Sequence, residues 1–475
     1  MDKANSEIPT SGGAGDNTSR ANFGSRLGAI LAAAGSAVGL GNIWRFPCET
    51  GANGGAAFIL LYIMCIALVA VPVLIIEFAT GRDARANAYD TFRNLAKTSS
   101  AGAIGRFTWC AIGAMCVLAG FLVFSYYSVV AGWTLEYTFE AGINGMAGKG
   151  MEQYTQDFAT FSANPIRPAV WLFIFVAVTT GIVILGVQRG IERGSKIMMP
   201  MLFVLLIVLG ICSLTLPNAS KGIEFLFKPD FSKITSSVLL NAMGQAFFTL
   251  SVGIGCLMTY ASYFSAKVNI VKDACNVAVI DTCVAILAGI IIFPAAMSVG
   301  INPDAGPSLV FITLPNVFSQ AFGSTPWLCY IVTLMFYLLL TMAALTSSIS
   351  MLEITTAFVS EKFSIKRWKA AIILALITCM AGFTCSMSFG DWADVKIFGM
   401  GFFDLFDFFV AKFAMPIGGI FMCILMRRLG KKKVQAMLTN NGSLNLHSFP
   451  VLFYYLVSYV TPLLILVIFI NELVA

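Results

Sequence analysis

The stretch Gly35-Ser36-Ala37-Val38-Gly39-Leu40-Gly41-Asn42 decides how the rest of the sequence is interpreted. It lies inside an apolar segment that is long enough to cross a membrane. Three glycines and two small polar side chains suit a helix interior poorly, because each glycine costs about 1 kcal/mol relative to alanine. Inside a membrane, backbone groups released from helical bonding need other partners. The stretch therefore predicts a broken helix whose free amides and carbonyls line a site.

The composition of the whole chain is that of a membrane protein. Of 475 residues, 58% are hydrophobic and 11% are charged, whereas soluble proteins carry roughly 25% charged residues. The net charge of +6 does not indicate nucleic-acid binding, because the charges lie in short loops between apolar runs. The 12 cysteines lack metal-site spacing, and the single histidine, His447, cannot support histidine-based catalysis. We therefore expect neither an enzyme nor a nucleic-acid partner.

Apolar runs of about 20 residues predict membrane-spanning helices. Eleven are expected, at approximately 23–47, 52–80, 104–136, 169–188, 193–215, 237–265, 270–300, 326–360, 366–387, 395–426 and 449–473. Most of the 30 Lys and Arg residues fall in alternate loops, which the positive-inside rule assigns to the cytoplasm. The N-terminus is thus expected inside and the C-terminus outside. Residues 1–22 are expected to form a disordered cytoplasmic leader.

A second glycine-rich break indicates an internal repeat. Val38-Gly39-Leu40-Gly41 recurs five spans later as Val252-Gly253-Ile254-Gly255. Five spans invert the topology, and breaks at matching places in inverted halves point to a transporter site at the midplane. The expected fold is an all-α integral membrane protein with inverted five-helix repeats at 23–215 and 237–426. Residues 449–473 would add an eleventh helix.

The two ends of a broken helix suit opposite charges. Amides at the start of the outer half favour an anionic group, and carbonyls at the end of the inner half favour a cation. Such a site suits a zwitterion, and amino acids are the commonest small ones. Asp281, in the middle of a predicted span, is a candidate for binding a cation. Glu77 and Glu353 lie nearer to the ends of their spans, which favours structural hydrogen bonding.

Hydroxyl side chains gather in the predicted span 326–360. Thr346 and Ser347 follow Ala343 by three and four residues. Hydroxyls in membrane helices usually bond to a carbonyl of their own helix or pack as small interface residues. The alternative is that these two hydroxyls and the Ala343 carbonyl supply oxygen ligands for Na⁺.

The quoted residues resemble the neurotransmitter:sodium symporter family, in its bacterial eleven-helix amino-acid transporter subgroup. The resemblance rests on 34–47, 53–58 and 259–263, and it extends over nearly the whole chain. It implies a LeuT-type fold in the bacterial inner membrane. It also implies Na⁺-coupled import of a neutral, hydrophobic or aromatic L-amino acid by alternating access. Two alternatives stay open: a non-transporting amino-acid sensor, and a symporter for another small carboxylate-bearing amine.

The resemblance implies roles for individual residues. The substrate is expected to contact Ala37, Gly39, Leu40, Gly41, Val123, Tyr127, Phe248, Thr249, Ser251, Ile254, Ser347 and Met351. A first Na⁺ is expected at Ala37, Asn42, Thr249 and Asp281, and a second at Gly35, Val38, Ala343, Thr346 and Ser347. The expected gates are Arg45 with Asp407 outside and Arg20 with Glu361 inside.

Two departures from relatives refine these expectations. Gly39 stands where amine-transporting relatives have an aspartate, which favours a substrate that carries its own carboxylate. Asp281 stands where many relatives have an asparagine, near a chloride site whose surroundings match Tyr62, Gln245 and Thr249. A fixed carboxylate there is expected to make chloride unnecessary. The sequence does not indicate an oligomeric state.

Overall fold

The computed structural model of the protein describes residues 21–97, 103–146, 148–300 and 309–474. In these ranges the chain is helical, and its β structure amounts to an isolated bridge between Ile397 and Met400. The all-α class expected from the sequence is therefore confirmed. The leader predicted at 1–22 lies outside the described residues, apart from its last two positions.

The first half of the described chain contains four candidate membrane spans and one bent helix pair. Its α-helices are α1 (Arg26–Ala37), α2 (Phe46–Ala52), α3 (Ala56–Cys65), α4 (Val71–Ala84), α5 (Ala88–Lys97), α6 (Ala103–Gly142), α7 (Met151–Ala163), α8 (Arg167–Ile184), α9 (Arg193–Leu214) and α10 (Ala219–Phe227). Three wider π-helical segments join some of them: η1 (Gly41–Arg45), η2 (Ile66–Ala70) and η3 (Val187–Glu192). A short 3₁₀ turn, η4 (Phe231–Lys233), precedes the second half.

The second half of the described chain is also helical. Its α-helices are α11 (Ser236–Thr249), α12 (Cys256–Ala261), α13 (Ile270–Ser298), α14 (Leu314–Phe322), α15 (Pro326–Phe363), α16 (Arg367–Met387), α17 (Phe402–Asp407), α18 (Met415–Thr439), α19 (Phe449–Tyr455) and α20 (Thr461–Val474). The π-helical segments are η5 (Leu309–Thr313), η6 (Phe408–Ala414) and η7 (Leu456–Val460). The repeat boundaries at 23–215 and 237–426 stay predictions.

Long apolar helices account for most of the predicted spans. In the described part of the chain, 9 helices are long and apolar enough to cross a membrane, or 10 if the bent pair at Arg26–Ala37 and Gly41–Ala52 is one span. The span expected at 237–265 differs, because residues 250–255 divide it into α11 and α12, each too short to cross alone. The number of continuous spans is therefore lower than the expected eleven because one span is divided at a predicted break.

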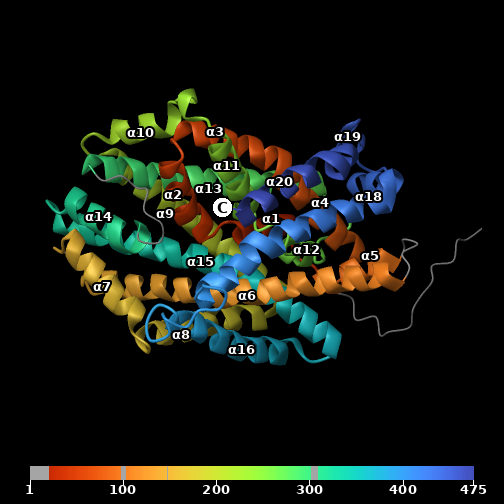
Figure 1. Ribbon diagram of the computed structural model, residues 1–475, viewed down its shortest axis with the longest axis horizontal. Coiled ribbons are helices and arrows are strands. Elements are labelled where there is room, and N and C mark those ends of the chain that lie inside the picture. The colour runs from red at the N-terminus through yellow and green to blue at the C-terminus, as the bar shows by residue number, and fades with distance from the viewer. Residues whose placement is uncertain (1–20, 98–102, 147, 301–308, 475) are drawn as a thin grey trace, which may run out of the picture.

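The helices pack around a central region where the two breaks lie. α6 and α15, the longest helices, run side by side through the molecule, and α1 packs against α9, α13 and α15 (Figure 1). Peripheral helices expose apolar side chains on their outer faces; Val204 is 59% exposed and Leu376 is 62% exposed. Such faces suit lipid rather than water, whereas the interior-facing sides are closely packed.

Candidate substrate and ion site

The first break separates α1 from η1 at residues 38–40. The two helical parts are bent by 53° relative to each other. The Gly39 amide donates to Asn42 Oδ1 at 2.9 Å, and the Leu40 amide donates to the Tyr127 hydroxyl at 3.3 Å. Side chains have thus replaced the helical acceptors of these amides, as burial of a polar backbone requires.

The second break, residues 250–255, is held by a buried carboxylate. Gly253 has φ of +95°, and a Cβ there would lie 2.3 Å from the Met415 carbonyl oxygen, so glycine is needed for both conformation and space. The Glu77 side chain, from α4, accepts from the Gly253 amide at 2.7 Å and from the Met258 amide at 2.9 Å. Glu77 therefore caps α12, which confirms the structural hydrogen bonding expected for this residue.

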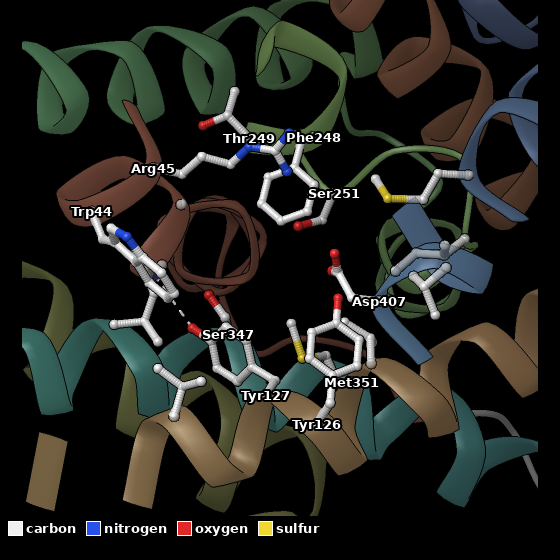
Figure 2. A pocket seen from close by; sticks show the side chains of 18 of the residues that line it. Trp44, Arg45, Tyr126, Tyr127, Phe248, Thr249, Ser251, Ser347, Met351 and Asp407 are labelled. Carbon is white, nitrogen blue, oxygen red and sulfur yellow. Dashed lines mark hydrogen bonds between the residues drawn. The ribbon is translucent and has the colours of Figure 1, made fainter. Parts of the chain in front are cut away.

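A cavity of about 330 Å³ lies between the two breaks, enclosed by α1, η1, α6, α11 and α15 (Figure 2). The structure brings together every residue that the sequence predicted for substrate contact. The cavity is lined by Ala37, Gly39, Leu40, Gly41, Val123, Tyr127, Phe248, Thr249, Ser251, Ile254, Ser347 and Met351. Their individual roles stay predictions.

The cavity also has lining residues that the sequence reasoning missed. These are Trp44, Arg45, Cys48, Glu49, Tyr126, Val130, Phe403, Asp407, Val410 and Met415, of which Arg45 and Asp407 were predicted only as a gate. Helical spacing could have found Tyr126 and Val130, which lie three and seven residues after Val123 on one helix face. Helical spacing does not predict the lining residues Phe403, Val410 and Met415 of α17, η6 and α18, because tertiary packing brings these elements to the cavity.

Three of the residues predicted for the first Na⁺ form one hydrogen-bonded cluster. Asn42 Nδ2 lies 2.8 Å from Asp281 Oδ1, and the Thr249 hydroxyl donates to Asp281 Oδ2 at 3.0 Å. Asp281 is fully buried, and Ala37 lines the adjacent cavity. A buried carboxylate beside a hydroxyl oxygen has the chemistry of an alkali-cation site, while Asn42 turns its NH₂ group to Asp281 and its oxygen to the Gly39 amide. The cluster joins the two breaks directly.

The residues predicted for the second Na⁺ converge between α1 and α15. The Thr346 hydroxyl lies 2.9 Å from the Ala343 carbonyl and 3.3 Å from the Val38 carbonyl. The Ser347 hydroxyl lies 2.8 Å from the Val38 carbonyl and 3.4 Å from that of Gly35. Five oxygens from two helices are therefore gathered in a buried position. Thr346 also bonds within its own helix, which is one of the two interpretations of these hydroxyls. Their role as Na⁺ ligands stays a prediction.

Gly39 lines the cavity at the first break, close to Ser347 and Tyr127. A Cβ at this position would lie 2.5 Å from Ser347 Oγ and 3.1 Å from the Tyr127 hydroxyl. Any side chain here would displace the Ser347 hydroxyl from its place beside the Val38 carbonyl. The absence of a side chain at Gly39 thus keeps both hydroxyls directed at the break.

The surroundings matched to a chloride site in relatives lie beside Asp281. The Tyr62 hydroxyl and Gln245 Oε1 are buried, and neither has a hydrogen-bond partner among the described residues. Gln245 Nε2 donates to the Gly41 carbonyl at 3.4 Å. The acidic side chain in this region is that of Asp281, which is fully buried.

The predicted gate residues Arg45 and Asp407 both line the mouth of the cavity (Figure 2). Arg45 Nε lies 3.9 Å from Glu49 Oε1, and its guanidinium carbon lies 4.3 Å from the centre of the Phe248 ring. Asp407 lies on the other side of the mouth, near the Tyr126 hydroxyl (Figure 2). The gate function of this pair stays a prediction.

Two ion pairs, each with a buried carboxylate, lie on the opposite side of the site. Arg26 Nη2 lies 2.5 Å from Asp273 Oδ1, which fastens the start of α1 to α13. Glu353 accepts from Arg367 Nη1 at 2.8 Å and from the Tyr263 hydroxyl at 2.6 Å, which confirms its expected structural bonding. These contacts separate the cavity from the end of the molecule at which α1 begins.

The predicted inner gate is described only at one of its two residues. Glu361 accepts from Asn87 Nδ2 at 2.7 Å. Arg20 lies outside the described residues. The Arg20–Glu361 pair therefore stays a prediction.

Two broken helices around a closed-ended cavity, within a bundle of apolar spans, define the class as a membrane transporter. The model of the Sodium:neurotransmitter symporter family matches residues 20–147 and 162–475. The chain belongs to this family, and it is a transporter rather than an enzyme.

Similar proteins come from several microorganisms. The chain is 38% identical over 451 residues to YhdH, an uncharacterized sodium-dependent transporter of Bacillus subtilis, covering 94% of this chain and 97% of the relative. It is 34% identical to an uncharacterized sodium-dependent transporter of Haemophilus influenzae, covering 96% and 99%. Among solved structures, MhsT in complex with L-phenylalanine matches with a TM-score of 0.84 and 41% identity, covering 95% of this chain and 100% of that one.

Proposed function

We propose that the protein is a Na⁺-coupled symporter that imports a neutral, hydrophobic or aromatic L-amino acid by alternating access. The observation that carries this proposal is the position of the cavity. It touches the polar groups of the first break at one end and apolar side chains at the other, and an oxygen-rich cluster adjoins each break. The membership of a sodium-dependent family agrees with this assignment.

The substrate carboxylate would bind at the first break. The Leu40 amide and the Tyr127 hydroxyl already lie within 3.3 Å of each other, and a carboxylate could accept from both. The substrate amine would face carbonyls near Ala37 and Phe248 together with Ser251. The missing side chain at Gly39 leaves space for a carboxylate and supplies no acid to hold an amine that lacks one.

The substrate side chain would occupy the apolar wall. Val123, Ile254 and Met351 line this part of the cavity, and the cavity has a volume of about 330 Å³. Methionine is unbranched and adapts to different shapes, which suits a range of apolar side chains. The solved structure of MhsT, a similar protein, contains L-phenylalanine, in agreement with this chemistry.

Two Na⁺ ions would accompany the substrate. One would bind where Asp281, Asn42 and Thr249 meet, beside the substrate carboxylate, so that ion and substrate stabilise each other. The other would bind between α1 and α15, at the oxygens around Thr346 and Ser347. The fixed Asp281 carboxylate would make chloride dispensable. An inward potential would favour import by about 2.3 kcal/mol per charge per 100 mV.

Alternating access would use the two ends of the cavity. In the orientation predicted from basic loops, the Arg45 side is extracellular and the Arg26 side is cytoplasmic. Approach of Arg45 and Asp407 would close the outer side over the bound substrate. Separation of α1 from α13, which breaks the Arg26–Asp273 pair, would open the inner side.

Uptake into proteoliposomes tests this function. Purified protein should accumulate radiolabelled L-phenylalanine or L-leucine when Na⁺ is outside and K⁺ is inside, and should catalyse counterflow of the same amino acid. Binding of the amino acid without any flux would favour a sensor. Flux of a different carboxylate-bearing amine, with none of any apolar amino acid, would contradict the proposed substrate class.

A further inference from the structure

A pair of serines joins α1 to α15 beside the oxygen cluster proposed for the second Na⁺. Ser36 Oγ donates to Ser350 Oγ at 2.7 Å, and Ser350 Oγ donates to the Ser347 carbonyl at 2.7 Å. Ser36 and Ser350 are buried, with exposed fractions of 0% and 1%. We call these two residues the serine bridge. It is a directed chain of two hydrogen bonds that runs from the broken helix to the intact one.

The direction of the Ser36 hydroxyl differs from the usual behaviour of hydroxyls in membrane helices. Serine and threonine there commonly donate to a carbonyl of their own helix, three or four residues earlier. Ser128 donates in this way to the Phe124 carbonyl at 2.6 Å, and Thr355 donates to the Leu352 carbonyl at 2.9 Å. Because the Ser36 hydroxyl donates to another helix, its single proton contributes to the contact between α1 and α15.

The serine bridge lies next to the carbonyls that α1 brings to the cluster. Ser36 directly follows Gly35 and precedes Val38 by two residues. The carbonyls of Gly35 and Val38 lie 3.4 Å and 2.8 Å from the Ser347 hydroxyl. Ser350 lies about one helical turn after Ser347 on α15. A shift of α1 at Ser36 would therefore move both carbonyls relative to the hydroxyls of α15.

Close packing around Gly35 places α1 against its neighbours at the level of the serine bridge. A Cβ at Gly35 would lie 3.3 Å from Thr346 Cβ on α15 and 3.4 Å from Met199 Sδ on α9. The three helices therefore pack closely here because Gly35 has no side chain. Such packing limits how near α1 can come but supplies no directed bond, whereas the hydroxyl of Ser36 supplies one at the next residue.

We propose that the serine bridge is a positioning pair that fixes α1 against α15 and thereby sets the fit of the second oxygen cluster to Na⁺. The inference deepens the proposed Na⁺-coupled symport and rests on it. In this role Ser36 and Ser350 do not bind the ion. They act through the α1 carbonyls and through Ser347, because they hold together the two helices that carry those oxygens.

Oxygens held in fixed positions would also make the cluster selective for one cation size. Na⁺ and Li⁺ carry the same charge, so a site distinguishes them by its size, its number of ligands and its rigidity. Without the bond from Ser36 to Ser350, the two α1 carbonyls could move relative to Ser347. The cluster would then bind Na⁺ more weakly and would adapt more easily to Li⁺. A bond that only stabilised the fold would leave the ratio of the two affinities unchanged.

Titration of thermal stability with each ion tests the inference without transport. The apparent unfolding temperature of the purified full chain in detergent is measured against NaCl or LiCl, with choline chloride keeping the ionic strength constant. An ion that binds the folded protein raises this temperature saturably. Ser36→Ala should raise the half-saturating Na⁺ concentration roughly threefold, as expected for one interhelical hydroxyl bond, and should bring the Na⁺ and Li⁺ values closer together. Alanine is smaller than serine and favours helices, so the variant should fold.

Combined variants isolate the bond between the two serines. Ser36→Ala/Ser350→Ala should behave like Ser350→Ala alone, whereas two independent effects would multiply to roughly ninefold. Ser36→Ala should also add nothing to Thr346→Ala/Ser347→Ala, which already lacks the hydroxyls of the cluster. Ser128→Ala is the matched control, because it removes a buried hydroxyl that bonds within its own helix, and it should leave both ion affinities unchanged.

Three results would each overturn the serine bridge as a positioning pair. They are an unchanged ratio of Na⁺ to Li⁺ affinity in Ser36→Ala, multiplied effects in the double variant, and an added effect of Ser36→Ala on the Thr346→Ala/Ser347→Ala background. Failure of the proposed function has a different signature. In that case the wild-type protein itself would show neither stabilisation by Na⁺ nor Na⁺-driven uptake, which would remove the ion site and this inference with it.

Discussion

The two breaks in this transporter look alike in sequence but are held in different ways. At the first, residues 38–40, the freed backbone groups meet neutral side chains: the Leu40 amide meets the Tyr127 hydroxyl, and the Val38 carbonyl meets Ser347. At the second, residues 250–255, two amides are fixed by the Glu77 carboxylate, which is fully buried.

This difference suggests that the hydrogen bonds at the second break are permanent, whereas those at the first break can be replaced by a ligand. A charged acceptor bound to two buried amides holds its segment strongly, since each such bond contributes about 1.5–3 kcal/mol. Bonds between neutral hydroxyls and backbone groups contribute about 1 kcal/mol, so an ion or a substrate can replace them. We infer that the second break is scaffold, whereas the first is the part that responds to ligands. Asp281 connects them through Asn42 and Thr249.

The largest effect is expected from Glu77→Gln, which should destabilise the protein by removing an acceptor at the second break. Glutamine retains one oxygen and turns an NH₂ donor toward a backbone amide, so a buried donor loses its acceptor. We expect folding to lose about 3 kcal/mol or more, with a clear drop in apparent unfolding temperature. Glu224→Gln, at an exposed position, is the control. An unchanged unfolding temperature for Glu77→Gln would show that the carboxylate does not hold the break.

The next effect is expected from Asp281→Asn, at the junction of the two breaks. Removing a buried charge that faces a cation should raise the Na⁺ concentration for half-maximal amino-acid binding by about 100-fold or more in chloride-free buffer. Added chloride should restore part of the affinity, because it replaces the missing negative charge. Asp394→Asn, an exposed site, should have neither effect. Binding that is independent of both ions in Asp281→Asn would remove Asp281 from the Na⁺ site.

Tyr127→Phe addresses the first break from the substrate side. The variant removes the hydroxyl that would donate to the substrate carboxylate, so amino-acid affinity should fall roughly 10-fold or more. Loss of the bond from the Leu40 amide should cost folding only about 1 kcal/mol. Titration of radiolabelled amino acid at saturating Na⁺ gives the ratio of the dissociation constants of variant and wild type. Tyr330→Phe, which removes an exposed hydroxyl, serves for comparison. Equal affinity in the two variants would mean that the carboxylate binds elsewhere.

The smallest effect is expected from the double variant Thr346→Ala/Ser347→Ala. It removes two neutral oxygens from the cluster between α1 and α15, so the Na⁺ concentration for half-maximal uptake should rise about threefold to tenfold. Ser348→Ala is the matched control, because its hydroxyl bonds to the Leu345 carbonyl of its own helix at 2.9 Å. If Ser348→Ala shifted the Na⁺ dependence as much, the proposed second ion site would have no support.

Much of this architecture was predictable because it follows from local sequence. Glycines in apolar segments predicted both breaks, and the family resemblance indicated twelve residues that the fold brings to one cavity. Glu77 was recognised as structural from its position near a span end, although its partners on α12 could not be foreseen. That pairing depends on how two distant helices pack.

The remaining features of the site, which the sequence did not predict, depend on tertiary contacts and on the conformation of the protein. Phe403, Val410 and Met415 reach the cavity because α17, η6 and α18 fold across its mouth, and no periodicity signals this. Arg45 and Asp407 were predicted as partners. In the structure, the guanidinium carbon of Arg45 lies 4.3 Å from the centre of the Phe248 ring, and its Nε lies 3.9 Å from Glu49 Oε1. The sequence resemblance suggested the Arg45–Asp407 pair, but the contacts of Arg45 in this conformation depend on how the helices pack.

Equilibrium binding of L-phenylalanine in Na⁺ and in K⁺ tests the central claim most directly. If the first break is an exchangeable site shared by ion and substrate, the purified protein should bind L-phenylalanine saturably in Na⁺. In K⁺ at the same ionic strength, binding should be weaker by about 10-fold or more, because the typical coupling between two sites is 1–3 kcal/mol. Equal affinity in the two salts would contradict the account.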